Sequence, residues 1–301
     1  MPEHVFHPDL RLARFLPRST PLGLTRRLGR LTRPRPPRGG ELVRIDADVS
    51  IRVFRPPIAG PVPALLWIHG GGYVLGSATQ ADAWCREVSN RLGAIAAAVE
   101  YRLAPEHPFP VPLEDCYSAL RWLAAQPDVD AERIAIGGES AGGGLAAALA
   151  LLAKERGTIR PVLQVLSYPM LDDRTALRTD TDPASLRMWS PGNNRWAWNA
   201  YLGIHAAAPP PLGAPGRYDD LTGVAPAWMG VGTSDLFHDE DVAYAQGLGQ
   251  AGVPCELRVV PGAYHGFDLV ERHASISRAY RGSQMAALER ALNTDRAADR
   301  H

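Results

Sequence analysis

From residue 41 onward, short apolar runs alternate with longer segments that have helical periodicity. An apolar run of about four to eight residues between turn residues predicts a buried strand, and apolar residues three or four positions apart predict a helix. Strands that alternate with helices form a mostly parallel sheet covered on both faces, so the sequence predicts an α/β fold. The predicted strands are 64–69, 94–101, 133–138, 162–168, 227–232 and 256–260, preceded by a hairpin over 42–54. The predicted helices are 113–125, 141–155, 239–251 and 275–292.

Composition excludes several classes of protein. The 301 residues are enough for one large domain with a small cap, and the 32 basic residues balance the 32 acidic ones. A balanced charge gives no reason to expect nucleic acid or a membrane surface as a partner. No apolar run approaches the roughly 18 residues of a membrane-spanning helix, and no apolar segment typical of a secretory signal starts the chain. We therefore expect a cytoplasmic protein that does not insert into membranes.

The three cysteines are Cys85, Cys116 and Cys255. They are far apart, and no pair has the CxxC spacing of a zinc site or a redox motif. An odd number of dispersed cysteines also argues against a disulfide framework. We expect them to be small core residues.

Two segments depart from the alternation of strands and helices. The first 40 residues contain nine arginines against Glu3 and Asp9, which is consistent with a basic arm for anions or lipid headgroups. The favoured interpretation is a partly helical segment that packs on the main domain through Phe6, Leu10, Leu12, Phe15 and Leu16. The second segment, residues 170–211, is rich in Trp, Asp, Arg, Pro and Asn. An insertion after a strand is where α/β enzymes place lids, although its tryptophans are also consistent with a simple packed core.

The strongest local motif is Gly138-Glu139-Ser140-Ala141-Gly142, between a predicted strand and a predicted helix. A serine on such a sharp turn projects its hydroxyl clear of the sheet, and glycines flank it because Cβ atoms would not fit. The following helix directs its N-terminus at the reacting centre, where it favours developing negative charge. Ser140 is therefore the candidate nucleophile.

A second motif, His69-Gly70-Gly71-Gly72, directly follows a predicted buried strand. Three consecutive glycines let the backbone turn its N–H groups toward a substrate oxygen, which is what an oxyanion hole requires. A phosphate-binding loop is disfavoured because no GK[ST] follows and residues 73–75 are apolar.

A serine nucleophile needs a general base, and the base needs an acid that orients it. For this type of fold the chain order is Ser, then Asp or Glu, then His. His265 lies just past the predicted strand 256–260, at the carboxyl edge of the sheet where such sites gather. Asp235 follows the predicted strand 227–232 in the same way.

Three other acids compete with Asp235 for the orienting role. They are Asp239, Glu240 and Asp241. All three fall in the first turn of a predicted helix, where acids are ordinary partners of the helix dipole. We therefore favour Asp235.

These motifs occur in register with others. The segments 69–72 (HGGG), 101–110 (YRLAPEHPFP), 138–143 (GESAGG), 232–235 (GTSD) and 265–267 (HGF) span nearly all of the predicted catalytic domain. Together they resemble the hormone-sensitive lipase family of esterases (bacterial family IV) of the α/β-hydrolase superfamily. Glu139 stands where that family usually has Asp.

The resemblance implies a helical cap and the groups of the oxyanion hole. Residues 1–40 would form the N-terminal part of the cap, 170–211 the cap insertion, and 41–169 with 212–301 the catalytic domain. Backbone N–H groups would come from Gly71, Gly72 and Ala141, with His69, Gly70 and Glu139 as supporting residues.

The implied function is a carboxylesterase that hydrolyses short- to medium-chain esters through an acyl-enzyme, with Ser140, His265 and Asp235 as the triad. It needs no cofactor or metal, and its partner is a small ester. One alternative is a deacetylase or amidase on a specific small molecule. Another is a ligand-binding receptor on the same fold, which is disfavoured because His265 is present. The sequence leaves a homodimer open.

Overall fold

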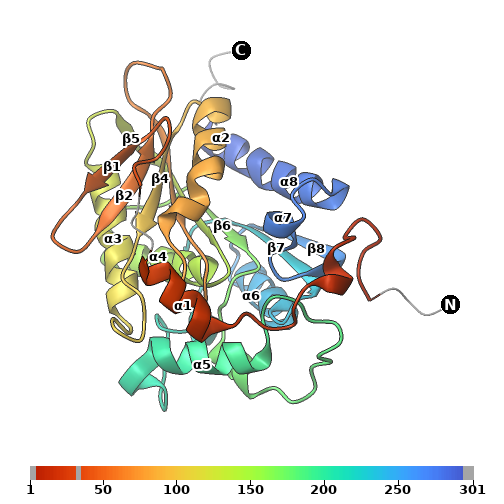
Figure 1. Ribbon diagram of the computed structural model, residues 1–301. Coiled ribbons are helices and arrows are strands. Elements are labelled where there is room, and N and C mark those ends of the chain that lie inside the picture. Colours follow the sequence, from red (N-terminus) through yellow and green to blue (C-terminus); the bar gives the residue numbers. More distant parts are fainter. Residues whose placement is uncertain (1–4, 32–34, 294–301) are drawn as a thin grey trace.

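The computed structural model describes residues 5–31 and 35–293. Figure 1 shows one sheet with helices packed against both faces. The sheet has eight strands in the order β1-β2-β4-β3-β5-β6-β7-β8. β2 pairs antiparallel with β1 and β4, and the remaining pairs are parallel. The strands are β1 (Glu41–Arg44), β2 (Ser50–Phe54), β3 (Val62–Ile68), β4 (Ile95–Glu100), β5 (Val129–Glu139), β6 (Leu163–Ser167), β7 (Ala227–Ser234) and β8 (Cys255–Tyr264).

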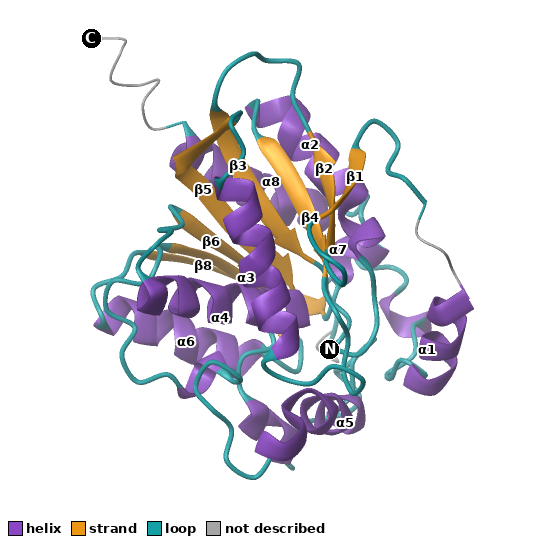
Figure 2. Ribbon diagram, turned by 90° about the vertical axis from the view of Figure 1, so that its left-hand side faces the viewer, coloured by secondary structure: helices purple, strands orange, loops and turns teal. Residues whose placement is uncertain are grey.

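Most of the helices form two layers, one on each face of the sheet, whereas the first and the fifth, α1 and α5, lie beyond one end of the strands (Figure 2). They are α1 (Leu22–Leu31), α2 (Asp82–Leu92), α3 (Val111–Ala124), α4 (Ala141–Arg156), α5 (Pro191–Leu202), α6 (His238–Gln250), α7 (Phe267–Val270) and α8 (Ser275–Leu292). In β3, Leu65 and Trp67 pack in the core beside α2 and α8, whereas Leu66 and Ile68 pack in the core beside α3, α4 and α6. This division follows from the strand geometry, in which successive side chains point to opposite faces. The predicted α/β architecture is confirmed.

Helix α4 is the most deeply buried element next to the sheet. Every residue from Ala141 to Ala153 is buried, which suits a helix made almost entirely of Ala, Gly and Leu. Its small residues let it lie close to neighbouring backbone: a Cβ on Gly143 would come within 3.0 Å of the Cα of Pro169. The buried position of α4 fixes the place of its N-terminus, which follows Ser140.

The N-terminal segment and the insertion after β6 pack against each other (Figure 2). Thr20 donates its hydroxyl proton to the carbonyl of Met188 at 2.6 Å, and the amide of Asn193 donates to the carbonyl of Thr20 at 2.7 Å. The backbone N–H of Met188 also donates to Pro17 at 2.8 Å. Two segments about 170 residues apart in sequence thereby form one layer, containing α1 and α5.

The expected packing of the N-terminal segment is only partly right. Phe6 and Leu16 pack against the core as predicted. Leu10 is buried as predicted, but the side chains of Leu12 and Phe15 are 49% and 72% exposed. A short 3-10 helix over Ala13–Phe15 turns Ala13 inward in their place. No helix within the described residues is both long enough and apolar enough to cross a membrane.

Candidate active site

Ser140 lies in a tight turn between β5 and α4, with φ 55° and ψ −122°. A non-glycine residue with such a φ costs about 1 to 3 kcal/mol and persists only when its surroundings hold it. Here the N–H of Ser140 donates to the carbonyl of Ser167 at 2.9 Å, and the carbonyl of Ser140 accepts from Met170 at 3.0 Å. A Cβ on Gly142 would collide with the carbonyl of Ile68 in β3, so position 142 must be a glycine for the turn to pack against that strand.

The structure brings Ser140, His265 and Asp235 into one hydrogen-bonded chain. The hydroxyl of Ser140 lies 2.9 Å from Nε2 of His265, and Nδ1 of His265 lies 2.8 Å from Oδ2 of Asp235. All three residues are buried, with exposed fractions of 6%, 8% and 6%. The three come from the ends of β5, β7 and β8, as the sequence predicted. Rings of Phe237 and Tyr168 pack edge-on against the imidazole, with centroids 5.2 and 5.0 Å away.

The other acids of helix α6 do not reach His265. Asp239 is exposed and pairs with Arg178 at 2.5 Å and with His238 at 2.8 Å. Glu240 instead accepts a hydrogen bond from the backbone N–H of Leu171 at 2.7 Å. Asp241 is buried, and neither of its carboxylate oxygens has a hydrogen-bond partner among the described residues. Of the four candidate acids, Asp235 is the one whose carboxylate lies within hydrogen-bond distance of His265.

Residues 69–75 form a loop, called here the glycine loop, that passes beside Ser140. A Cβ on Gly70 would lie 3.2 Å from the Cβ of Ser140, so the two backbones are in close contact. Gly71 and Gly72 have φ values of 116° and 60°, a region that favours glycine. Among the described residues, no acceptor meets the backbone N–H of Gly71 or Gly72. Ala141 is the first residue of α4, directly after Ser140.

His69 stabilises the start of the glycine loop. Its Nδ1 lies 2.8 Å from the carbonyl of Gly70, and its ring stacks on Tyr101 with centroids 4.3 Å apart. The hydroxyl of Tyr101 donates to the carbonyl of His69 at 3.0 Å. Burial lowers the pKa of His69 to about 4, so the imidazole is neutral at physiological pH. These contacts fit the supporting role expected for His69.

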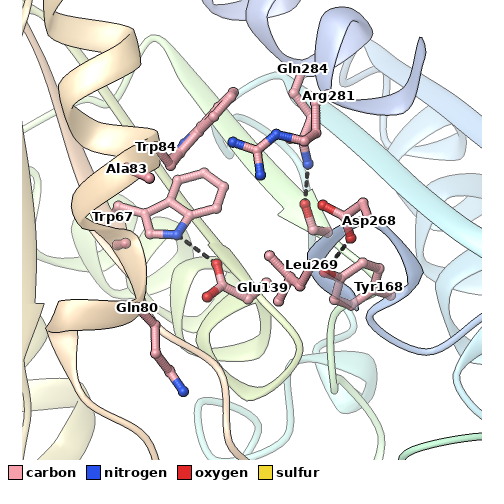
Figure 3. Close-up of a pocket in the computed structure, with 12 residues that line it drawn as sticks. Trp67, Gln80, Ala83, Trp84, Glu139, Tyr168, Asp268, Leu269, Arg281 and Gln284 are labelled. Carbon is pink, nitrogen blue, oxygen red and sulfur yellow. Dashed lines mark hydrogen bonds between the residues drawn. The ribbon is translucent and has the colours of Figure 1, made fainter. Parts of the chain in front are cut away.

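Glu139 precedes Ser140 in the chain, and its side chain lines a small cavity between α2, α7 and α8 (Figure 3). One carboxylate oxygen accepts from the indole N–H of Trp67 at 2.6 Å, and the other accepts a longer hydrogen bond from Gly70 N–H at 3.4 Å. The pKa of Glu139 is raised to about 7, mainly by burial and in smaller part by the nearby Asp268 carboxylate, while the hydrogen bond from Trp67 opposes the rise. Glu139 thus connects the nucleophile turn to the glycine loop.

We expect the Glu139→Gln variant to lose activity in a pH-dependent way. Above the Glu139 pKa of about 7 the wild-type carboxylate offers an acceptor to both N–H groups, whereas Gln has only one acceptor oxygen. Below that pKa the wild-type carboxyl is neutral and resembles Gln. The ratio of wild-type to variant kcat should therefore rise from near 1 at pH 5.5 to on the order of 10 at pH 8.5.

Taking the ratio removes every pH-dependent step that the wild type and the variant share. A ratio that stays constant across the pH range would contradict the bracing role of Glu139. A loss as large as that expected on removing the nucleophile would instead mean that Glu139 takes part directly in the chemistry.

Two residues at the same cavity were not found from the sequence. The hydroxyl of Tyr168 donates to Asp268 at 2.7 Å, and both side chains are buried (Figure 3). Tyr168 also packs edge-on against the imidazole of His265. Their only signal in sequence is their position just after β6 and just after His265, at the carboxyl ends of strands.

The tryptophans of the insertion have different surroundings. Trp189 is buried, and a Cβ on Gly72 would collide with its ring. The centroid of the Trp189 ring lies 6.4 Å from that of the His265 ring. Trp198 is buried against Tyr73, while Trp196 is 43% exposed. Trp189 is therefore the tryptophan of this group that lies next to both the imidazole and the glycine loop.

This fold and this site define an α/β hydrolase, and the comparisons with known proteins agree. Residues 65–269 match the family model described as the alpha/beta hydrolase fold, so the chain belongs to that family. It is 38% identical over 226 residues to an ethyl acetate hydrolase of Pseudomonas putida, which covers 73% of this chain and 71% of that protein. It is 36% identical over 262 residues to the carboxylesterase NlhH of Mycobacterium tuberculosis, which covers 82% and 79% of the two chains.

A solved structure of a bacterial heroin esterase superposes with a TM-score of 0.85 at 36% identity, covering 96% of this chain and 98% of that one. These relatives agree with the resemblance that the motifs indicated. In residues 5–31 and 35–293, no three His, Cys, Asp or Glu side chains are grouped so that they could hold a metal ion.

Proposed function

We propose that this chain is a carboxylesterase that cleaves short- to medium-chain esters through an acyl-enzyme. The observation that carries the proposal is the hydrogen-bonded chain from Ser140 through His265 to Asp235. It lies beside the glycine loop, where the N–H groups of Gly71 and Gly72 have no acceptor in the described part of the chain. The names of the relatives support the same class of reaction.

In the first half of the reaction, the hydroxyl of Ser140 attacks the ester carbonyl while Nε2 of His265 takes its proton. Asp235 holds the imidazole by its Nδ1–H and stabilises the imidazolium that forms. The carbonyl oxygen becomes an oxyanion, which the N–H groups of Gly71, Gly72 and Ala141 bind. His265 then gives its proton to the leaving alcohol.

In the second half, His265 removes a proton from a water molecule, which attacks the acyl-enzyme at the same carbonyl carbon. A second oxyanion forms in the same hole and collapses to release the carboxylic acid. Ser140 recovers its proton from His265. Every step uses only these side chains, backbone N–H groups and water.

We further propose that residues 1–40 and 170–211 form the cap over this site, with residues 41–169 and 212–301 as the catalytic domain. Residues 1–4 and 32–34 lie outside the described part of the chain. The packing of the N-terminal segment against the insertion supports this division. So does Trp189, which belongs to the insertion and lies against Gly72 of the glycine loop. The cap would bound the acyl pocket, with Trp189 as a wall.

For a panel of nitrophenyl esters from acetate to palmitate, we expect kcat/KM to rise, peak at or below about six acyl carbons, and fall. Each added methylene contributes about 0.8 kcal/mol by burial until the acyl chain meets the wall. The variant Trp189→Leu should move the peak to longer chains. The matched variant Trp196→Leu, at an exposed site, should leave the peak in place.

An anilide with the same acyl group belongs in the panel, because it separates an esterase from an amidase. Faster cleavage of the anilide than of the ester would favour the amidase. A preference for esters of twelve or more carbons, with activation at a lipid interface, would contradict the closed acyl pocket.

A further inference from the structure

Arg26 of α1 reaches from the cap to the glycine loop. Its Nη1 donates to the backbone carbonyl of Val74, the penultimate residue of that loop, and to the carbonyl of Ala104 at 2.7 Å. Its Nη2 donates to both carboxylate oxygens of Glu106, at 2.9 and 2.7 Å. The side chain is only 13% exposed although α1 lies at the surface. A single guanidinium therefore connects the N-terminal segment to two backbone segments of the catalytic domain.

The carbonyl of Val74 is coupled to the proposed oxyanion hole through two peptide units. The carbonyl of Val74 and the N–H of Leu75 belong to one planar peptide group and point in opposite directions. That N–H donates to the carbonyl of Gly71 at 3.0 Å. The carbonyl of Gly71 in turn shares its peptide group with the N–H of Gly72. The chain of contacts thus runs from the Arg26 guanidinium to the N–H of Gly72.

The glycine loop needs such support because one of its residues with a positive φ, Tyr73, is not a glycine. Gly71, Gly72 and Tyr73 have φ values of 116°, 60° and 65°. A backbone of this kind keeps its shape only where contacts outside the loop hold it. The ring of Tyr73 stacks on Tyr201 of α5 at 3.9 Å, so the insertion also supplies one of these contacts.

We propose that Arg26 is a positioning residue for the oxyanion hole, because it orients and polarises the N–H of Gly72 through the Val74–Leu75 and Gly71–Gly72 peptide groups. This inference rests on the proposed esterase function and extends it. Aligned peptide dipoles strengthen one another, and a cation at one end draws electron density away from the N–H at the other. The planar guanidinium can donate to two carbonyls and a carboxylate at once, which a lysine ammonium cannot do in the same geometry. The oxyanion hole would then be complete only when the N-terminal segment is packed on the catalytic domain, with Arg26 in contact with the glycine loop.

The test compares Arg26→Met, Arg26→Lys and Arg27→Met in the full chain. Arg27 is the next residue on the same helix and is exposed, so Arg27→Met is the matched control. We expect Arg26→Met to lower kcat by about 10- to 100-fold with KM within about threefold of wild type, because misplacing one oxyanion donor acts on the transition state. Arg26→Lys should fall between wild type and Arg26→Met, and Arg27→Met should stay within about twofold of wild type.

A second readout separates positioning from a general loss of structure. A trifluoromethyl ketone forms a hemiketal with Ser140 whose oxyanion occupies the hole, so its inhibition constant should rise in Arg26→Met by about the same factor as kcat falls. The values of kcat are expressed per active site titrated with a nitrophenyl phosphonate. If Arg26→Met does not fold, the same two quantities are measured for Arg26→Lys. We expect the inhibition constant of the ketone to rise by about the factor by which kcat falls.

The inference is overturned if Arg26→Met retains the kcat of Arg27→Met, or if kcat falls while the ketone binds as tightly as before. The inference is also overturned if Arg26→Lys lowers kcat without raising the inhibition constant of the trifluoromethyl ketone by a similar factor. Failure of the proposed function is a separate result, since it would appear as a wild-type protein that does not hydrolyse the esters.

Discussion

Replacing Ser140 with alanine should lower kcat by on the order of 10⁴ to 10⁶. The oxygen of its hydroxyl would form the bond of the acyl-enzyme, and it lies 2.9 Å from Nε2 of His265, the proposed general base. Alanine fits the turn sterically, since the strained backbone is held by its bonds to Ser167 and Met170 rather than by the side chain. The fold should therefore survive, which circular dichroism and thermal unfolding would check. Turnover of nitrophenyl acetate is the measure of activity.

The matched control is Ser275→Ala, at an exposed serine that starts α8. It should keep wild-type turnover. An organophosphate should label wild type and Ser275→Ala at Ser140 and should fail to label Ser140→Ala. Near-wild-type turnover by Ser140→Ala would refute the proposed nucleophile and the esterase mechanism built on it.

The motifs around Ser140 and His69 could be predicted from the sequence because each places its chemistry in consecutive residues. A turn with φ 55° between a strand and a helix needs neighbouring glycines, and those glycines are visible in the sequence itself. The same holds for the loop at Gly71 and Gly72. An unusual backbone conformation requires glycines at or next to the same positions in the sequence. These predictions therefore needed no knowledge of tertiary contacts.

Other parts of the site depend on contacts between distant residues and left no such signal. Arg26 is one of nine arginines in the first 40 residues, and nothing in the sequence distinguishes it from Arg27. Its role emerges only from the carbonyls of Val74 and Ala104, about 50 and 80 residues further along the chain. Helix α2 (Asp82–Leu92) was also missed, although it covers one face of the sheet.

The expected packing of the N-terminal segment was only partly right for a related reason. Apolar residues such as Leu10 and Phe15 look alike in a short, irregular segment, where no long periodic pattern shows which of them face the core. The structure buries Leu10 and Ala13 and leaves Phe15 exposed, because a single 3-10 turn decides the orientation of each side chain. Hydrophobic periodicity predicts the buried face of a long helix, but a three-residue turn is too short to show it.

The variant Asp235→Asn should lower kcat by about 10⁴ while leaving the fold intact. In the wild type, Oδ1 of Asp235 accepts a hydrogen bond from the backbone N–H of Phe237 at 3.0 Å, and Oδ2 faces Nδ1 of His265 at 2.8 Å. An asparagine would give its single oxygen to the N–H of Phe237, which leaves its NH₂ group against Nδ1. That contact favours the tautomer protonated on Nε2, and an Nε2–H cannot take the proton of Ser140.

The matched control is Asp239→Asn, four residues away. Asp239 is exposed and contacts Arg178 and His238, so its loss should leave kcat within about twofold of wild type. The comparison is direct because both variants remove one negative charge from the same short segment. Only the removal of the charge that faces His265 should matter, since an imidazole needs a specific acceptor at Nδ1 rather than a general negative potential. If Asp239→Asn lost most of its kcat and Asp235→Asn lost little, the assignment would be wrong. The acid that orients His265 would then be Asp239 of helix α6.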